Sequence, residues 1–169
     1  MLGACVERSG CAGDTCAVAN ISVRPARVGD LRILSAVDER VTAGSERLAK
    51  LRTLINDERG LCLLAETDTT EVCGYVAVSR RGFFGRDFVE LLQVGKPWRR
   101  RGIALQLLEA TVHRADTATV FTSTNESNEP MRRLLESHGW SFSGVLDGLD
   151  EGDPEVVYYR RRPGGLSPD

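Results

Sequence analysis

Residues 94–104, VGKPWRRRGIA, join a run typical of a strand to a run typical of a helix, with three arginines and a glycine at the junction. The preceding run, Phe88–Val94, is mostly apolar and favours a strand. The following run, Gly102–Ala115, places its apolar side chains on one side at helical spacing. Because a helix start offers free N–H groups and the positive end of the helix dipole, this junction is a candidate phosphate site. The alternative is a solvated basic turn before a helix.

Two common phosphate-binding patterns are absent from the junction. A P-loop requires G-x-x-x-x-G-K followed by Ser or Thr, and a dinucleotide-binding fold requires G-x-G-x-x-G. The sequence has neither, since Gly102 is the only glycine available at the helix start. Gly102 and Ala104 are small, so that an anion can approach the backbone closely. The junction therefore favours a phosphate site of another kind.

On both sides of the junction, the apolar periodicity and the Gly and Pro residues predict the remaining elements. Before it, strands are predicted at Ile21–Arg24, Leu61–Glu66 and Val72–Ser79, helices at Asp30–Val41 and Glu46–Asn56, and a turn at Arg80–Arg86. After it, strands are predicted at Ala118–Ser123, Trp140–Val145 and Val156–Arg160, and a helix at Pro130–His138. We expect a mobile arm at residues 1–20, one domain over residues 21–162 and a frayed tail at residues 163–169. This order predicts an α/β fold with a mixed sheet.

The composition is that of an ordinary globular protein. The chain has 169 residues, 41% of them hydrophobic and 27% charged, which suits one domain with a full core. With 22 basic and 24 acidic residues, the net charge of -2 disfavours a nucleic-acid-binding protein. No apolar run approaches the roughly 20 residues of a membrane span, and the first residues do not resemble a secretory signal. We therefore expect a cytoplasmic protein that binds neither nucleic acid nor membrane.

The five cysteines predict neither a disulfide framework nor a metal site. Their number is odd, and Cys5, Cys11 and Cys16 do not have C-x-x-C spacing. Cys62 and Cys73 lie in or beside apolar runs, which favours packed thiols. We therefore expect no bound metal.

Two motifs resemble those of the GNAT superfamily of N-acetyltransferases. Residues 99–104, RRRGIA, follow a strand that ends in LQV and are similar to that family's Gln/Arg-x-x-Gly-x-Gly/Ala signature. Residues 128–140, NEPMRRLLESHGW, are similar to its Asn-x-x-Ala-x-x-Leu-Tyr-x-x-x-Gly-Phe segment. Both motifs occur in the family's order, and the resemblance spans about residues 21–160. It implies a GNAT-like α/β (α+β) single domain, with a mixed, mostly antiparallel sheet of about seven strands flanked by about four helices.

The resemblance also implies acetyl-CoA as the cosubstrate and a site for it around the junction. In the family, backbone N–H groups at the helix start hold the pyrophosphate, and the end of the preceding strand hydrogen-bonds the pantetheine arm and the acyl carbonyl. Carried over, the cofactor-binding residues are Leu92, Gln93, Val94, Arg99, Arg100, Arg101, Gly102, Ile103, Ala104 and Leu105. Asn128 would contact the cofactor from the other side, although it fits a helix cap equally well.

Glu90 is the candidate general base for the attack of an amine on the thioester. A primary amine with a pKa of about 10.4 is neutral in only about one molecule in a few thousand at pH 7, so that a base assists the attack. By the two-residue period of a strand, Glu90 shares a face with Val94, and related enzymes often place a catalytic Glu there. The alternative is a strand carboxylate that pairs with an arginine.

The family's general acid is usually a tyrosine, and this chain has Leu135 at that position. Leu135 continues the apolar side of its helix and is predicted to be part of the core. Tyr158, Tyr159, Ser127 and water are the candidates to protonate the leaving thiolate instead. A thiolate with a pKa of about 8.5 does not strictly require an acid.

The loop over residues 147–155 carries five carboxylates in nine residues. Beside an acyl site it would attract a cationic acceptor, with Asp150 and Glu151 as substrate-binding residues and Phe84 on the opposite wall; a solvated turn is the alternative. We therefore favour an N-acetyltransferase that acts on a primary amine of a small molecule. A protein N-terminal or lysine acetyltransferase and a non-catalytic acyl-CoA-binding domain are the alternatives. The oligomeric state, a homodimer included, is left open.

Overall fold

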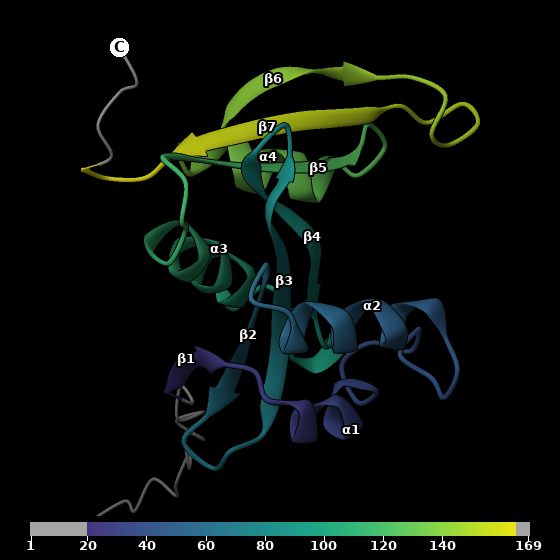
Figure 1. Cartoon of the computed structure of the whole chain (residues 1–169), viewed down its shortest axis with the longest axis vertical. Helices are drawn as coiled ribbons and strands as arrows, with labels where there is room; N and C mark the ends of the chain where they lie inside the picture. The colour runs from purple at the N-terminus through teal and green to yellow at the C-terminus, as the bar shows by residue number, and fades with distance from the viewer. Residues whose placement is uncertain (1–19, 165–169) are drawn as a thin grey trace, which may run out of the picture.

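The computed structural model describes residues 20–164, so that all but the last residue of the predicted arm and most of the predicted tail lie outside the described residues. The strands are β1 Ile21–Pro25, β2 Gly60–Thr67, β3 Val72–Phe83, β4 Arg86–Val94, β5 Thr119–Asn125, β6 Ser141–Leu146 and β7 Glu155–Arg161 (Figure 1). The helices are α1 Leu31–Leu34, α2 Glu46–Asn56, α3 Ile103–His113 and α4 Glu129–Ser137, with short 3-10 helices at Val28–Asp30 and Lys96–Trp98. Within this part of the chain, no helix has the length and apolar character needed to cross a membrane.

The strands form one seven-stranded sheet in the order β1-β2-β3-β4-β5-β7-β6. Neighbouring strands are antiparallel except β4 and β5, which are parallel and connected through α3. A parallel pair needs such a crossover connection, because the chain must return to the end of the sheet where the first strand began before the second strand can run in the same direction. The predicted fold, one domain with a mixed and mostly antiparallel sheet, is therefore confirmed.

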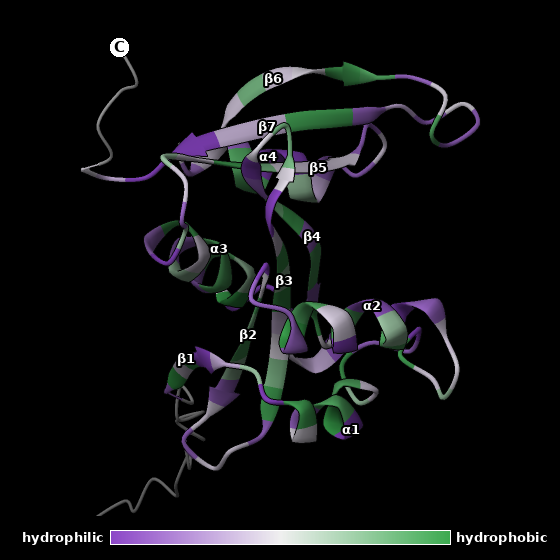
Figure 2. Cartoon of the chain, viewed as in Figure 1, coloured by the Kyte–Doolittle hydropathy of each residue, from purple (hydrophilic) through white to green (hydrophobic). Residues whose placement is uncertain are grey.

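Helices cover both faces of the sheet, and each face has its own core. α3 and α4 pack on one face through Leu107 and Leu135, and α1 and α2 pack on the other through Leu34 and Leu51. Alternate residues of β3 belong to the two cores, as expected for a central strand that is buried on both sides. Figure 2 shows the resulting hydrophobic residues along β2, β3 and β4.

The parallel strands β4 and β5 separate along their length. They pair only from Asp87 to Val89, opposite residues 120–122, although β4 continues to Val94. The buried Asp87 carboxylate stabilises the paired end, since it accepts a hydrogen bond at 2.8 Å from the N–H of Asp116, shortly before β5 begins. Beyond Val89, one edge of each strand has backbone groups that no longer pair across the sheet, and such groups suit a ligand.

The predicted helix Asp30–Val41 is wrong in its second half. α1 ends at Leu34, and residues 35–45 form turns and loop. Asp38 in this loop is only 2% exposed, and its carboxylate accepts hydrogen bonds from the Arg40 N–H at 3.0 Å and the Tyr75 hydroxyl at 2.6 Å. A side-chain oxygen that bonds a backbone N–H two residues further on competes with helical hydrogen bonding. The buried carboxylate therefore gives a physical reason for the early end of the helix.

The predicted turn Arg80–Arg86 is longer than the turn in the structure. β3 continues to Phe83 and β4 begins at Arg86, so that Phe84 and Gly85 alone connect them. Both residues have positive φ, 48° and 74°, as the central residues of a type I′ hairpin turn require. The turn leaves the Phe84 side chain 93% exposed at the tip of the hairpin.

Candidate active site

The chain passes from β4 to α3 through residues with left-handed backbone conformations. After the 3-10 helix Lys96–Trp98, Arg100 has φ 62° and Gly102 has φ 76°. Gly102 is the N-cap of α3, and glycine adopts this conformation without steric cost. The bond from Gln106 N to Gly102 O, at 3.1 Å, opens the helical ladder, so that the amides of residues 103–105 have no intrahelical acceptor. The helix start therefore presents the donors that a phosphate site requires.

Arginine side chains surround this helix start. Arg99 donates from Nε to the Val94 carbonyl oxygen at 3.2 Å, which holds the turn against the end of β4. The Arg101 guanidinium lies 5.1 Å from the centroid of the Trp98 ring, in a cation–π contact. Arg100 is exposed. Their positive charges add to the helix dipole, so that an anion is favoured here.

A cavity of about 420 Å³ lies between the end of β4, the start of α3 and α4. Six of the predicted cofactor-binding residues line it, and they come from both sequence motifs: Leu92, Gln93, Val94, Arg99, Ala104 and Asn128. α4 adds the side chains of Pro130, Met131 and Leu134. The other predicted residues, Arg100 to Ile103 and Leu105, lie at the adjoining helix start. The Ile103 side chain is buried in the core, so that only its backbone amide can face a ligand.

Asn128 serves as a helix cap and also lines this cavity. Its side chain accepts a hydrogen bond from Met131 N at 3.4 Å, and its Nδ2 donates to Thr124 Oγ1 at 3.0 Å. The two predicted roles of Asn128 are therefore geometrically compatible, since the cap fixes the side chain at the edge of the cavity.

Glu90 lies at a β-bulge in β4. The consecutive β3 residues 77 and 78 pair with residues 91 and 89 of β4, so that Glu90 is an extra residue. The bulge shifts the alternation of side chains by one position. Val94 packs against the α3–α4 core, whereas Glu90 contacts α2 on the opposite face. The prediction that Glu90 and Val94 share a face is therefore wrong.

Both carboxylate oxygens of Glu90 are hydrogen-bonded. Oε2 lies 2.6 Å from Lys50 Nζ of α2, and Oε1 accepts a hydrogen bond from Ser79 Oγ at 2.7 Å. The charged partner is a lysine, where the alternative prediction had an arginine. Because Val89 is the last β4 residue that pairs with β5, Glu90 lies where the two strands begin to separate.

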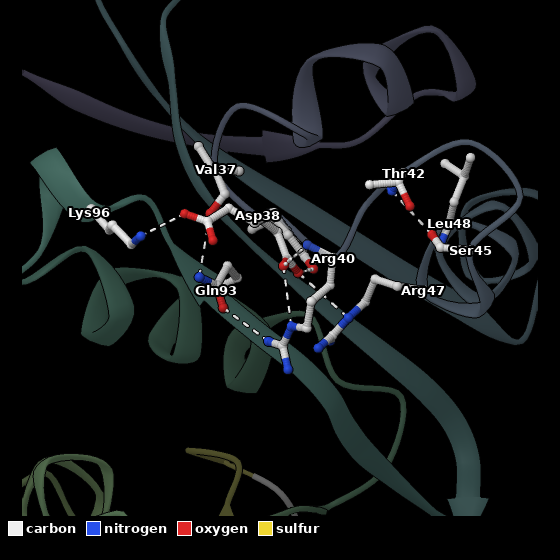
Figure 3. Close-up of polar contacts among 11 residues, drawn as sticks. Val37, Asp38, Arg40, Thr42, Ser45, Arg47, Leu48, Gln93 and Lys96 are labelled. Atoms are coloured by element: carbon white, nitrogen blue, oxygen red, sulfur yellow. Dashed lines mark hydrogen bonds and ion pairs between the residues drawn. The ribbon is translucent and has the colours of Figure 1, made fainter.

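A buried carboxylate that the sequence did not indicate links the α1–α2 loop to β4 (Figure 3). Asp38 contacts the Tyr75 hydroxyl, Arg40 Nε at 3.3 Å and Arg47 Nε at 3.5 Å. Burial opposes ionisation of Asp38, but the Tyr75 hydrogen bond, the Arg40 N–H and the two arginine charges lower its pKa overall. Arg40 in turn donates to Gln93 Oε1 at 3.4 Å. The α1–α2 loop is therefore hydrogen-bonded to Gln93, one of the predicted cofactor-binding residues.

Gln93 lies between two cavities. A second cavity, of about 520 Å³, is lined by loop residues 36–40 together with Gln93, Lys96, Pro97 and Arg99. Gln93 and Arg99 therefore line both cavities. Gln93 was predicted from the family resemblance, in which the end of this strand binds the pantetheine arm. Its loop partners were missed, because acidic and basic residues after an amphipathic run are equally typical of the solvent face of a helix.

The predicted acid candidates Tyr158 and Tyr159 point to opposite faces of the sheet. Tyr158 is buried in the α3–α4 core, and burial together with its hydrogen bond to Glu136, at 2.7 Å, raises its pKa. The Tyr159 ring lies on the other face, 5.9 Å from the Phe121 ring. Leu135, at the position of the family's tyrosine, is fully buried as predicted.

The predicted acceptor residues do not lie together. Asp150 and Glu151 are exposed in the β6–β7 loop, and Asp150 accepts a hydrogen bond from Asn125 Nδ2 at 2.8 Å at the end of β5. Phe84 instead lines a separate cavity of about 610 Å³, with Phe121 and Tyr159 among its aromatic walls. The acidic loop and Phe84 are therefore not opposite walls of one cavity.

Glu155, at the start of β7, is a second carboxylate that the sequence did not single out. Burial raises its pKa, and the nearby charges of Asp150 and Asp153 act in the same direction. Its Oε2 is buried and has no hydrogen-bond partner among residues 20–164. The negative charges of Asp150 and Asp153 therefore disfavour ionisation of Glu155 at this end of the sheet.

The described cysteines are packed thiols. Cys62 and Cys73 are both free and buried, as predicted, and burial raises the pKa of Cys62 to about 12. Residues 20–164 contain no group of three or more His, Cys, Asp or Glu side chains placed to hold a metal ion.

Comparison with known proteins identifies acetyltransferases that share this fold. The model of the acetyltransferase (GNAT) family matches residues 30–140, which is more than half of the chain. An acetyltransferase of the GNAT family from Bacillus cereus is 31% identical, with a TM-score of 0.76 over 88% of this chain and 99% of that chain. No curated protein matches the sequence.

Two further solved structures share the fold at low identity. An acetyltransferase from Bacillus anthracis in complex with acetyl coenzyme A is 14% identical, with a TM-score of 0.70 over 84% of this chain and 98% of that chain. The ribosomal-protein-S18-alanine N-acetyltransferase from Escherichia coli is 14% identical, with a TM-score of 0.71 over 89% of this chain and 97% of that chain.

Proposed function

Because the chain belongs to the GNAT family of acetyltransferases, which take the acetyl group from acetyl-CoA, we propose that it acetylates a primary amine of a small molecule. The observation that carries this proposal is the cavity of about 420 Å³, whose walls come from both motifs and adjoin the start of α3. The helix start has room for a ligand, since no heavy atom lies within 4 Å of the position that a Cβ on Gly102 would occupy.

We place the pyrophosphate of acetyl-CoA at the amides of residues 102–105, with Arg99, Arg100 and Arg101 supplying positive charge. The pantetheine arm then runs along residues 92–94, whose backbone edge toward β5 is unpaired. Asn128 contacts the arm from the α4 side. This direction brings the thioester towards Glu90, where β4 and β5 begin to separate.

Glu90 is proposed as the general base. The attacking amine must lose a proton, and at pH 7 deprotonating an ordinary amine in water costs about 4.6 kcal/mol. A carboxylate beside the amine accepts that proton as the nitrogen attacks the thioester carbon. The N–C bond forms, the C–S bond breaks, and the thiolate of coenzyme A leaves and takes up a proton. Lys50 must release Glu90 for this, and an incoming ammonium group can replace it.

Water, Tyr158, Tyr159 and Ser127 are the proposed acids for the leaving thiolate, and Ser127 Oγ donates a hydrogen bond to Asp153 Oδ2 at 2.7 Å. The Leu135 side chain has no ionisable group, so that the family's tyrosine position contributes only packing here. The Tyr158 hydroxyl donates a hydrogen bond to Glu136 Oε1, and Tyr159 lies on the face that Glu90 also occupies. Because a thiolate with a pKa of about 8.5 leaves readily, replacing either tyrosine by Phe should slow turnover much less than a change at Glu90.

The acidic β6–β7 loop supports a cationic acceptor, with Asp150 and Glu151 as contacts. The E. coli relative is named for acetylating an alanine of a ribosomal protein. At 14% identity it shares only the fold, so its acceptor does not carry over.

The experiment is an amine and peptide panel with acetyl-CoA, followed by release of free thiol. With the best amine, Glu90→Gln should lower kcat about 100-fold or more and leave the KM for acetyl-CoA nearly unchanged. The exposed Glu58→Gln is the matched control and should keep full activity. Unchanged turnover in Glu90→Gln would exclude Glu90 as the base. Turnover of peptides alone would favour a protein acetyltransferase, and acetyl-CoA binding without any turnover a non-catalytic domain.

A further inference from the structure

Lys50 lies where an acceptor amine would have to lie. Its Nζ is 2.6 Å from Glu90 Oε2, which is the hydrogen-bond distance that a general base needs to its proton donor. Ser79 occupies the other oxygen of Glu90 and so turns Oε2 towards α2. A primary ammonium group of the protein itself thus contacts the proposed base.

Helix α2 fixes the backbone of Lys50, whereas the end of the Lys50 side chain can move. α2 begins at the Ser45 cap, whose side chain accepts from Leu48 N at 3.2 Å, and Leu51 next to Lys50 is fully buried. The Lys50 side chain itself is 47% exposed, so that its ammonium group can move away from Glu90 and return. The helix therefore keeps Nζ near the carboxylate without locking it there.

Lysine is rare in this chain, which makes its presence here informative. Of the 22 basic residues only two are lysines, Lys50 and Lys96. Arginine would make the same ion pair, but its guanidinium stays protonated and does not attack a thioester. Lys96 pairs with Glu39 at 2.6 Å, and both side chains are well exposed, at the pyrophosphate end of the proposed site.

We propose that the protein acetylates its own Lys50 when acetyl-CoA is bound. This inference rests on the proposed function, since it uses the same donor and the same base. Glu90 accepts the proton of the ammonium group, Nζ attacks the thioester carbon, the N–C bond forms and the C–S bond breaks. As the amide forms, the nitrogen loses a second proton, which the departing thiolate takes up, and the proton on Glu90 passes to the solvent. The products are an acetyl-lysine at residue 50, coenzyme A with a free thiol, and one proton in solution.

Acetylation at Lys50 changes the site for later substrates. The amide has no charge, so that its ion pair with Glu90 is lost and the carboxylate becomes available to an external ammonium group. Until Lys50 is acetylated, its ammonium group and an external amine compete for Glu90. Turnover of an external amine should therefore show a lag that disappears after pre-incubation with acetyl-CoA.

The test uses the full-length protein with deuterated acetyl-CoA and peptide mass spectrometry of both lysines over time. Lys50 should gain the label about 100-fold faster than Lys96, the lower end of what a positioned base contributes. The rate should be first order and independent of protein concentration, because the reaction is intramolecular. Glu90→Gln should reduce labelling of Lys50 to the level of Lys96. Lys50→Arg keeps the charge and should show no label at residue 50.

The outcomes separate this inference from the proposed function, because the amine panel is run on the same samples. Turnover of an external amine with Lys50 unlabelled would overturn the inference alone. Equal labelling of both lysines, or labelling that survives Glu90→Gln, would mean non-enzymatic acetylation and would also overturn it. A rate that rises with protein concentration would contradict the intramolecular geometry. Circular dichroism of Glu90→Gln confirms that the variant is folded before its rate is compared.

Discussion

Replacing Gly102 with aspartate tests the phosphate site with a small change in shape. Gly102 is exposed, has φ 76°, and has no heavy atom within 4 Å of the position that a Cβ would occupy. A short side chain therefore fits, although the left-handed conformation costs roughly 1 kcal/mol in a residue other than glycine. Asparagine has nearly the shape of aspartate and tolerates this conformation similarly. Gly102→Asn is therefore the control that isolates the charge.

The charge sets the expected difference between the two variants. Coulomb's law for two unit charges about 6 Å apart gives about 0.7 kcal/mol in water and about 2.8 kcal/mol at an effective dielectric constant of about 20. A value of about 2 kcal/mol corresponds to roughly 30-fold weaker binding. A negative charge at a helix N-terminus stabilises the helix, so that Gly102→Asp should be at least as stable as Gly102→Asn.

Isothermal titration calorimetry with acetyl-CoA measures this difference. Gly102→Asp should bind about 30-fold more weakly than Gly102→Asn at low salt, and added salt should narrow the gap because exposed charges are screened. Both variants should melt about 2–4 °C below the unmodified protein. Equal affinities of the two variants would contradict the proposed phosphate site, because they would mean that no phosphate lies near the start of α3.

Two further predictions concern stability. Asp38→Asn should lower the free energy of unfolding by about 3 kcal/mol at pH 7, measured by urea denaturation, because Arg47 loses its buried partner. Because the pKa of Asp38 is lowered in the folded protein, its ionised form stabilises the fold above about pH 4, and this contribution is lost as the pH falls through the pKa of the folded state. The free energy of unfolding of Asp38→Asn should therefore decrease less in acid than that of the unmodified protein. Burial raises the pKa of Cys62 from 9.0 to about 12 and also raises the pKa of Tyr75. As the pH rises, the unfolded chain therefore loses these protons at a lower pH than the folded protein does. The urea midpoint should therefore fall as the pH rises from about 9 to about 12, and less steeply in Cys62→Ala; a slope unchanged by that substitution would contradict the role of the thiol.

The sequence was sufficient for the features that depend on local pattern. The apolar periods predicted the strands and the helices α2, α3 and α4 to within a few residues, and six residues that the motifs predict to bind the cofactor line one cavity. These features follow from local spacing, because helix and strand periods set which side chains share a face.

The features that the sequence missed depend on partners far away in the chain. The bulge at Glu90 reverses the face of that side chain, and a bulge is a mismatch between two strands, which one strand alone does not reveal. The short α1 reflects the contact of Asp38 with Tyr75, 37 residues later. The separation of Phe84 from the acidic loop depends on which strands are neighbours, and β7 lies between β5 and β6.

We propose that acetyl-CoA binds along the end of β4 and against the start of α3. A crystal structure of the protein in complex with acetyl-CoA would show where the cofactor lies. We predict the pyrophosphate within hydrogen-bond distance of the amides of residues 102–105, the pantetheine arm along residues 92–94, and the thioester near Glu90. Acetyl-CoA bound in the loop cavity beside Asp38, with the start of α3 unoccupied, would contradict this binding site.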